Sequence, residues 1–101
     1  MRMSYYDYVG YMLHEYFAPE KSNRLITPVY TTNKECVRKV LCERTELGYE
    51  ILRDVFSEPE ETPLPSAIRK CAMEREMDER QIWSIVRAAT KEIARARGLI
   101  D

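Results

Sequence analysis

The C-terminal part of the sequence carries a complete set of signals for one long helix. Asp78, followed three residues later by Gln81, has the pattern of a capping box, in which two side chains satisfy free backbone groups at a helix start. Gly98 suits the left-handed backbone position that follows a helix end, and Leu99 is expected to pack back on the helix. The sequence therefore predicts a helix over about 79–97.

This predicted helix has an apolar face and a basic face. At 100° per residue, its apolar side chains gather within about 60° of Ile82 and predict the side that enters the core. They are Ile82, Ile85, Val86, Ala89, Ile93 and Ala96. The opposite face is a band about 80° wide that holds four cations and one hydroxyl and no acidic residue. We call this band the basic ridge, and its members are Arg80, Ser84, Arg87, Lys91 and Arg95.

The basic ridge predicts contact with DNA. It runs for ~22 Å of helix axis, and in a major groove arginine can pair with guanine while lysine contacts phosphate. Solvated helix faces usually mix signs so that residues three or four apart can pair, whereas here Glu92 stands only at the side of the ridge. The shorter segment before it is joined through Met77 and Asp78, as in a helix-turn-helix. The alternative is an ordinary solvated face.

A small net charge conceals a polarised charge distribution. The chain has 16 Lys and Arg against 17 Asp and Glu, for a net charge of -1, which excludes a protein that is basic from end to end. Residues 64–101 carry eight bases and six acids, a net of +2, whereas residues 43–62 carry two bases and seven acids, a net of -5. Nucleic-acid contact must therefore come from local clustering.

Apolar spacing and capping signals at Ser4, Thr32 and Ser66 predict further helices. Their expected bounds are about 5–17, 32–44 and 67–77. The pattern resumes over 47–56, either as one bent helix continuing the second or as a separate helix that meets it near Thr45, and we favour two helices.

Two segments are predicted to be irregular or extended. Leu25 to Tyr30 is expected as a short extended segment, confined to an edge by Pro28, because proline has no backbone N–H to donate. Ser57 to Pro65 contains three prolines and is expected to be an irregular linker.

Length and composition then bound the class of protein. A chain of 101 residues with 45% hydrophobic and 33% charged residues is typical of one folded, soluble domain. It has neither an apolar run long enough to span a membrane nor an N-terminal leader pattern. We predict a single domain over 1–101, an all-α bundle of four or five helices ending in a helix-turn-helix. Residues 1–47 would supply N-terminal helices and residues 48–101 the helix-turn-helix-like part.

Short motifs in residues 48–101 match a known pattern. They are Gly48, Tyr49, Leu52, Arg53, Asp54, Ala67, Ile68, Lys70, Arg87, Ala89, Arg97, Gly98, Ile100 and Asp101. They resemble the C-terminal effector domain of the master sporulation response regulator of endospore-forming bacteria. The resemblance implies an all-helical, DNA-binding helix-turn-helix domain with Arg87 retained in its recognition helix. The chain departs from the family between Phe56 and Leu64, where it lacks most of one helix, and at Trp83, where the family is charged.

The N-terminal helix is rich in tyrosine. Tyr5, Tyr6, Tyr8, Tyr11 and Tyr16 fall on more than one of its faces, so one packing surface cannot bury them all. Tyrosine is enriched at protein interfaces, and Tyr5, Tyr8 and Tyr11 are therefore candidates for a homodimer or partner surface. The alternative is that Tyr5, Tyr8 and Tyr16 are half-buried edges of a small core.

The acidic segment offers a second function of a different class. Glu58, Glu60 and Glu61 are either solvated or form a patch that meets a basic partner. In the second case the protein would be a non-enzymatic adaptor or inhibitor, for example a phage-encoded one, that engages a basic protein such as a nuclease by mimicking nucleic-acid charge.

Residues for catalysis or metal binding are sparse. His14 is the sole histidine and has no ligand partner at metal-binding spacing, and the sequence has no nucleophile and base motif. Cys36, Cys42 and Cys71 match no disulfide or zinc pattern, and we expect reduced, mostly buried thiols in a cytoplasmic protein. We therefore expect a non-enzymatic DNA-binding transcription regulator that uses no cofactor or metal and has double-stranded DNA as its partner.

Overall fold

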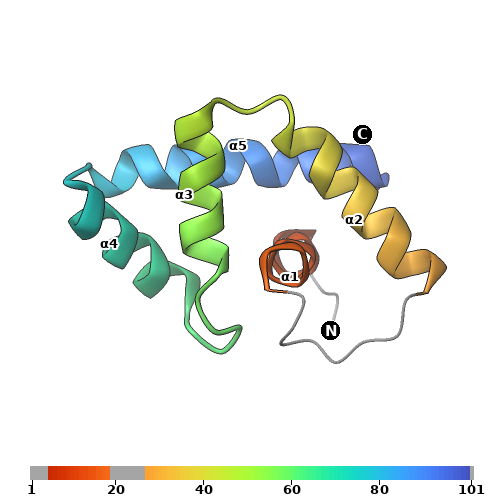
Figure 1. Ribbon diagram of the computed structural model, residues 1–101, viewed down its shortest axis with the longest axis horizontal. Helices are drawn as coiled ribbons and strands as arrows, with labels where there is room; N and C mark the ends of the chain where they lie inside the picture. The colour runs from red at the N-terminus through yellow and green to blue at the C-terminus, as the bar shows by residue number, and fades with distance from the viewer. Residues whose placement is uncertain (1–4, 19–26, 101) are drawn as a thin grey trace.

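The computed structural model of the chain describes residues 5–18 and 27–100. In these ranges it contains five helices and no strand (Figure 1). The helices are α1 (Tyr5–Phe17), α2 (Pro28–Leu41), α3 (Glu46–Phe56), α4 (Leu64–Arg75) and α5 (Glu79–Arg97). The predicted all-α fold class is therefore confirmed. None of these helices combines the length and the apolar character that crossing a bilayer requires.

The long C-terminal helix has the predicted bounds and caps. The Asp78 side chain accepts a hydrogen bond from the Arg80 backbone N–H at 2.9 Å, and the Gln81 side chain accepts from the Asp78 N–H at 3.2 Å. Gly98 ends α5 in the left-handed conformation with φ 81°. The expectation for Leu99 is wrong, because its side chain is 40% exposed and Ile100 packs on the core instead.

The start of α2 differs from the sequence prediction. Residues 28–30 belong to the helix rather than to an extended segment, while Leu25 and Ile26 lie outside the described residues. The cap is Thr27, whose hydroxyl accepts from the Tyr30 N–H at 3.1 Å, and not Thr32. Proline fits the first helical turn because its missing N–H would have no partner there in any case. The Ser4 capping signal also falls outside the described residues.

The centre of the chain forms two separate helices, as expected. Helix α2 ends at Leu41, and Thr45 caps α3 by accepting from the Gly48 N–H at 3.0 Å. Helix α4 starts at Leu64, three residues before the prediction, and it has no side-chain cap, so the expected role of Ser66 is wrong. The linker prediction was correspondingly too long, because Pro65 lies in the first turn of α4, where proline is tolerated.

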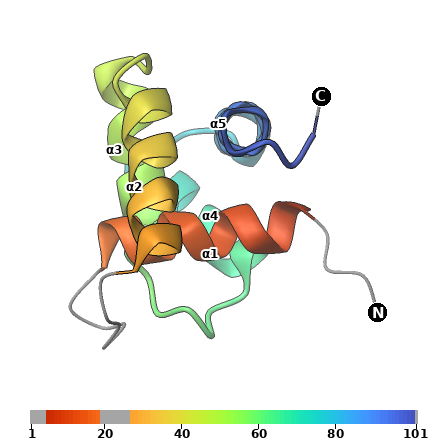
Figure 2. The same cartoon turned by 90° about the vertical axis from the view of Figure 1, so that its right-hand side faces the viewer.

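One core unites the five helices, and α5 packs against each of the other four. Figure 1 shows α5 extended behind the others, with α3 and α4 near its start and α2 near its end. Figure 2 looks along α5 and shows α2 and α3 to one side of it and α1 below, so that part of its circumference faces outward. Fully buried Ile51, Leu52, Ile68, Ile82 and Ile93 form the centre of the core.

The buried face of α5 is rotated from the predicted one. Thr90 and Ala94 are buried, whereas Ile85 is half-buried and Ala96 is exposed. Helices α1 and α2 both pack against α5, and α2 reaches its last turn, where Asn33 accepts a hydrogen bond from Arg97. The expectation for the thiols holds for Cys71, which is buried, but Cys42 is exposed.

Candidate nucleic-acid interface

A tight turn sets the direction of α5 relative to α4. Residues 76–78 connect the two helices, and Glu76 adopts the left-handed conformation with φ 53°. The Met77 N–H donates to the Ala72 carbonyl at 2.9 Å, which closes the end of α4. The Asp78 capping box then starts α5 at once. A turn of three residues with a fixed backbone holds the two helices in one orientation.

All five residues of the basic ridge are exposed. Arg80, Ser84, Arg87, Lys91 and Arg95 share one face of α5 by helical spacing, and each is exposed to solvent. The ridge is flanked by exposed Gln81 and Ala88, which are uncharged. The predicted exposure of the basic ridge on α5 is therefore confirmed.

Most of the ridge cations lack an acidic partner in the part of the chain that the structure describes. Arg95 pairs with Glu92, with Nη1 3.0 Å from Oε1. No described carboxylate lies within 4.0 Å of Arg80, Arg87 or Lys91. Helical side chains three or four residues apart usually pair when their charges are opposite, so this stripe of α5 is unlike a mixed solvated face.

The Arg87 side chain has an aromatic neighbour instead of a carboxylate. Its guanidinium carbon lies 5.3 Å from the centroid of the Trp83 ring, one turn earlier on α5. This distance is within the range of a cation–π interaction, which orients the planar guanidinium and stabilises it by about 0.5–1 kcal/mol at exposed sites. Trp83 is itself half-buried and packs against the core, so the ring is held in place.

Part of the acidic segment is neutralised within the protein. Arg75 on α4 contacts two acids of α3: its Nη2 is 2.6 Å from Asp54 Oδ2, and its Nη1 is 3.7 Å from Glu50 Oε2. The hydrogen bond to Asp54 raises the pKa of Arg75. Lys70 in turn pairs with Glu58 at 2.7 Å. Of the three predicted partner-binding glutamates, Glu58 is thus internally paired, and Glu60 and Glu61 are exposed without an ion pair among the described residues.

The tyrosines of α1 divide into two groups. Tyr5, Tyr8 and Tyr16 are half-buried against the core. This confirms the alternative prediction that these three are edges of the core. Tyr6 is 38% exposed, and the Tyr11 hydroxyl donates to Glu15 Oε2 at 3.0 Å. Only part of the predicted tyrosine surface is therefore available to a partner.

Tyr8 also belongs to a polar cluster that the sequence does not reveal. Asn33 on α2 is 2% exposed, and its Oδ1 accepts from Arg97 Nε on α5 at 2.7 Å. Its Nδ2 donates to the Tyr8 hydroxyl at 3.2 Å. The cluster links three helices through one buried amide, and no local pattern in the sequence marks it, because its members are 25 and 64 residues apart.

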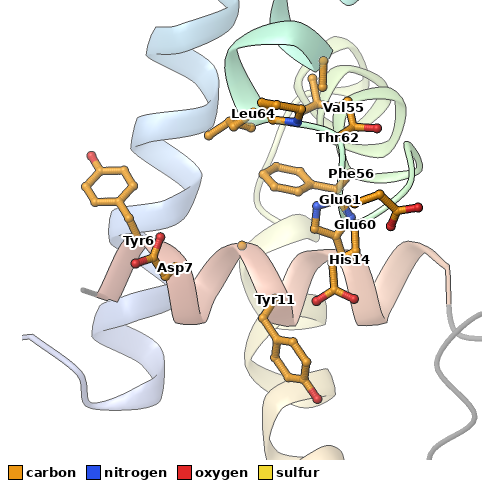
Figure 3. Close-up of a pocket in the computed structure, with 13 residues that line it drawn as sticks. Tyr6, Asp7, Tyr11, His14, Val55, Phe56, Glu60, Glu61, Thr62 and Leu64 are labelled. Carbon is orange, nitrogen blue, oxygen red and sulfur yellow. The ribbon is translucent and has the colours of Figure 1, made fainter. Parts of the chain in front are cut away.

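A groove lies along α1, between it and the connection from α3 to α4. Figure 3 shows Tyr6 and Asp7 at one end of it and His14 beside Glu60 at the other. The groove has a volume of about 360 Å³, and Val55 and Phe56 are among its apolar lining residues. Sequence reasoning singled out Glu60, Glu61 and Tyr11 but missed that they share a groove with His14.

His14 is an aromatic packing residue of this groove. Its ring meets Phe56 edge to face, with 5.3 Å between the ring centroids. Burial lowers the pKa of His14 below its usual value, and nearby Glu60 opposes this shift only in part. No group of three metal-binding side chains is found in the ranges that the structure describes.

Comparison with known proteins does not place the chain in a family. Searches of protein-family models, of curated proteins and of solved structures gave no match to this chain. The fold and the sites thus define a small all-helical protein with a basic ridge and an acidic groove. The resemblance to the sporulation effector domain stays a prediction.

Proposed function

We propose that the protein binds double-stranded DNA through α5 and acts as a small transcription regulator. The observation that carries the proposal is the exposed basic ridge, in which Arg80, Arg87 and Lys91 have no carboxylate within 4.0 Å among the described residues. Unpaired cations along one stripe of a helix supply the electrostatic attraction on which DNA binding largely depends.

The connection between α4 and α5 supports a helix-turn-helix arrangement. Two helices joined by a three- or four-residue turn are typical of this motif, and its second helix enters the major groove with its N-terminal residues toward the bases. On this basis we assign Arg80, Ser84 and Arg87 to base edges, and Lys91 and Arg95 to phosphates. Arg95 would have to leave Glu92, which costs little because both side chains are about half exposed.

Arg87 is the strongest candidate for a base contact. Arginine recognises guanine by two parallel hydrogen bonds, so the plane of the guanidinium matters. The Trp83 ring at 5.3 Å restricts that plane before DNA arrives. Lys91, with no such neighbour, is better suited to a phosphate, which it can contact from many directions.

A mobility shift on random duplex DNA at low salt tests the proposal without a known target. If Lys91 and Arg95 each neutralise one phosphate, log affinity should fall with log salt at a slope of about -1.8. Replacing Arg87 and Lys91 together by alanine should bring the slope to about -0.9 and remove the shift at moderate salt. The matched control replaces Lys34 and Lys39 of α2, which are exposed and lie off the ridge.

Comparison of the two double variants distinguishes binding through the basic ridge from general charge attraction. The control carries the same change in net charge, so it should retain binding. Equal loss in both variants would mean diffuse charge attraction, and no shift of the unchanged protein at low salt would exclude the proposed function. Sedimentation of the complex would show whether one or two copies bind, which tests the predicted homodimer.

A further inference from the structure

The groove along α1 has features of a binding site, independently of the basic ridge. It is lined by aromatic and apolar groups and by three carboxylates, those of Asp7, Glu60 and Glu61. No lysine or arginine is among its lining residues. Glu60 and Glu61 also have no ion pair in the described ranges. Glu60 and Glu61 therefore give this end of the groove a negative charge that no lining lysine or arginine offsets.

The floor of the groove is left open at a glycine. Gly10 lies in the middle of α1 and lines the groove, and a Cβ placed there would have no atom within 4 Å. Glycine inside a helix destabilises it by roughly 0.5–1 kcal/mol relative to alanine. The space above Gly10 is thus open in the middle of this helix face, and no side chain of α1 obstructs the groove at this position.

The walls of the groove suit a long, partly apolar cation. The aromatic wall is the half-buried His14 ring, which packs edge to face on the buried Phe56. Burial favours the neutral form of His14, so it adds no competing positive charge near neutral pH. Long basic side chains place an aliphatic stem on apolar surface and a charged head near carboxylates. An aromatic ring beside a cation adds a further favourable interaction.

We propose that this groove receives an arginine or lysine side chain from a basic segment of a partner protein. The stem would lie over Gly10 against the His14 ring, and the charged head would lie between Glu60 and Glu61. A protein is the occupant that fits the surroundings, because the exposed Tyr6 ring extends the groove at its end and tyrosine is typical of protein interfaces. The proposal does not rest on DNA binding by α5.

Titration of the ¹⁵N-labelled protein with short peptides tests the proposal. The probe is a glycine-rich peptide with two arginines, and its control is the same peptide with neutral citrulline in place of arginine. We expect saturable amide shifts around Gly10, His14 and Glu60 with the arginine peptide, a weaker response with its lysine analogue, and none with the citrulline peptide.

Variants of the groove separate binding from folding. Gly10→Met should fill the groove and abolish the saturable shifts, whereas Gly10→Ala should retain them, since it adds one methyl group in open space. Replacing Glu60 and Glu61 together by glutamine should weaken peptide binding about fivefold, because exposed pairs contribute modestly. The matched control is glutamine at Glu43 and Glu74, which are exposed and lie outside the groove.

Several results would overturn the proposal. Equal shifts with the citrulline peptide, or binding that survives Gly10→Met in a variant with normal thermal unfolding, would exclude the groove as a cation site. Binding of 1,4-diaminobutane as tight as that of the peptide would assign the groove to a free amine instead. Concentration-dependent self-association that the Gly10→Met variant loses would assign it to a second copy of this chain.

Discussion

Replacement of Glu76 by glycine is expected to stabilise the protein. Glu76 joins α4 to α5 with φ 53°, and a side chain in this left-handed conformation costs about 1–2 kcal/mol. Glycine removes that cost. It also makes the unfolded chain more flexible, which lowers the unfolding free energy by about 0.4–1 kcal/mol. The net gain in unfolding free energy is therefore about 0.8 kcal/mol, or about 3–6 °C in Tm for a domain of this size.

The assay is thermal unfolding followed by circular dichroism, and alanine at the same position is the control. Glu76→Ala removes the same negative charge from the end of α4 but keeps the backbone strain, so it should lie below Glu76→Gly by about 1 kcal/mol. If the glycine variant melts at or below the Tm of the alanine variant, the backbone of the turn does not carry the strain that we assign to it. An equal rise in both variants would trace the effect to charge at the helix end.

Three further predictions concern residues that connect the helices. Asn33→Leu should lower the unfolding free energy by about 2–3 kcal/mol in urea, because it leaves the half-buried Arg97 donor without its acceptor, and a loss below about 0.5 kcal/mol would contradict this. His14 has a folded-state pKa below its unfolded value near 6.5, so its contribution to stability is complete above that value and is lost as pH falls toward the folded pKa. The variant His14→Gln should thus lose less stability than the unchanged protein between about pH 7 and 5, as measured by urea unfolding at each pH, and an identical pH profile would count against the burial of the ring. Trp83→Ala should destabilise the protein by about 2 kcal/mol in the same assay, since the ring is half-buried, and Trp83→Phe should restore most of this.

The elements that could be predicted are those whose signals are local. Helix α5 has both caps and a regular apolar period within its own residues, and its bounds agree with the sequence prediction. Helix α1 is likewise as expected. The same locality made the exposed basic ridge predictable, because five residues on one helix face need no knowledge of the rest of the chain.

The errors come from residues with two physical roles. Pro28 excludes a central strand and equally favours a first helical turn, and the sequence does not say which applies. Similarly, Leu64 and Pro65 could end a linker or begin a helix. Ser66 has a capping side chain but lies inside α4, because the chain had already turned into the helix at Pro63.

The contacts that define the sites are mostly long-range and could not be derived from spacing. Arg75 meets Asp54 from 21 residues away, which neutralises part of the acidic segment. The groove brings His14 beside Glu60 only because α1 packs beside the connection between α3 and α4. Spacing along the chain therefore could not show that Glu58 is internally paired or that Glu60 lies beside His14.

The central position of α5 has a consequence for biosynthesis. Translation delivers α5 after the other four helices, yet each of them packs against it. Until it emerges, those helices lack their shared packing partner, and their apolar faces stay accessible to proteases and chaperones. A fragment that stops at residue 78 should accordingly be unfolded and rapidly degraded, and adding α5 as a separate peptide would be the most direct way to restore its structure.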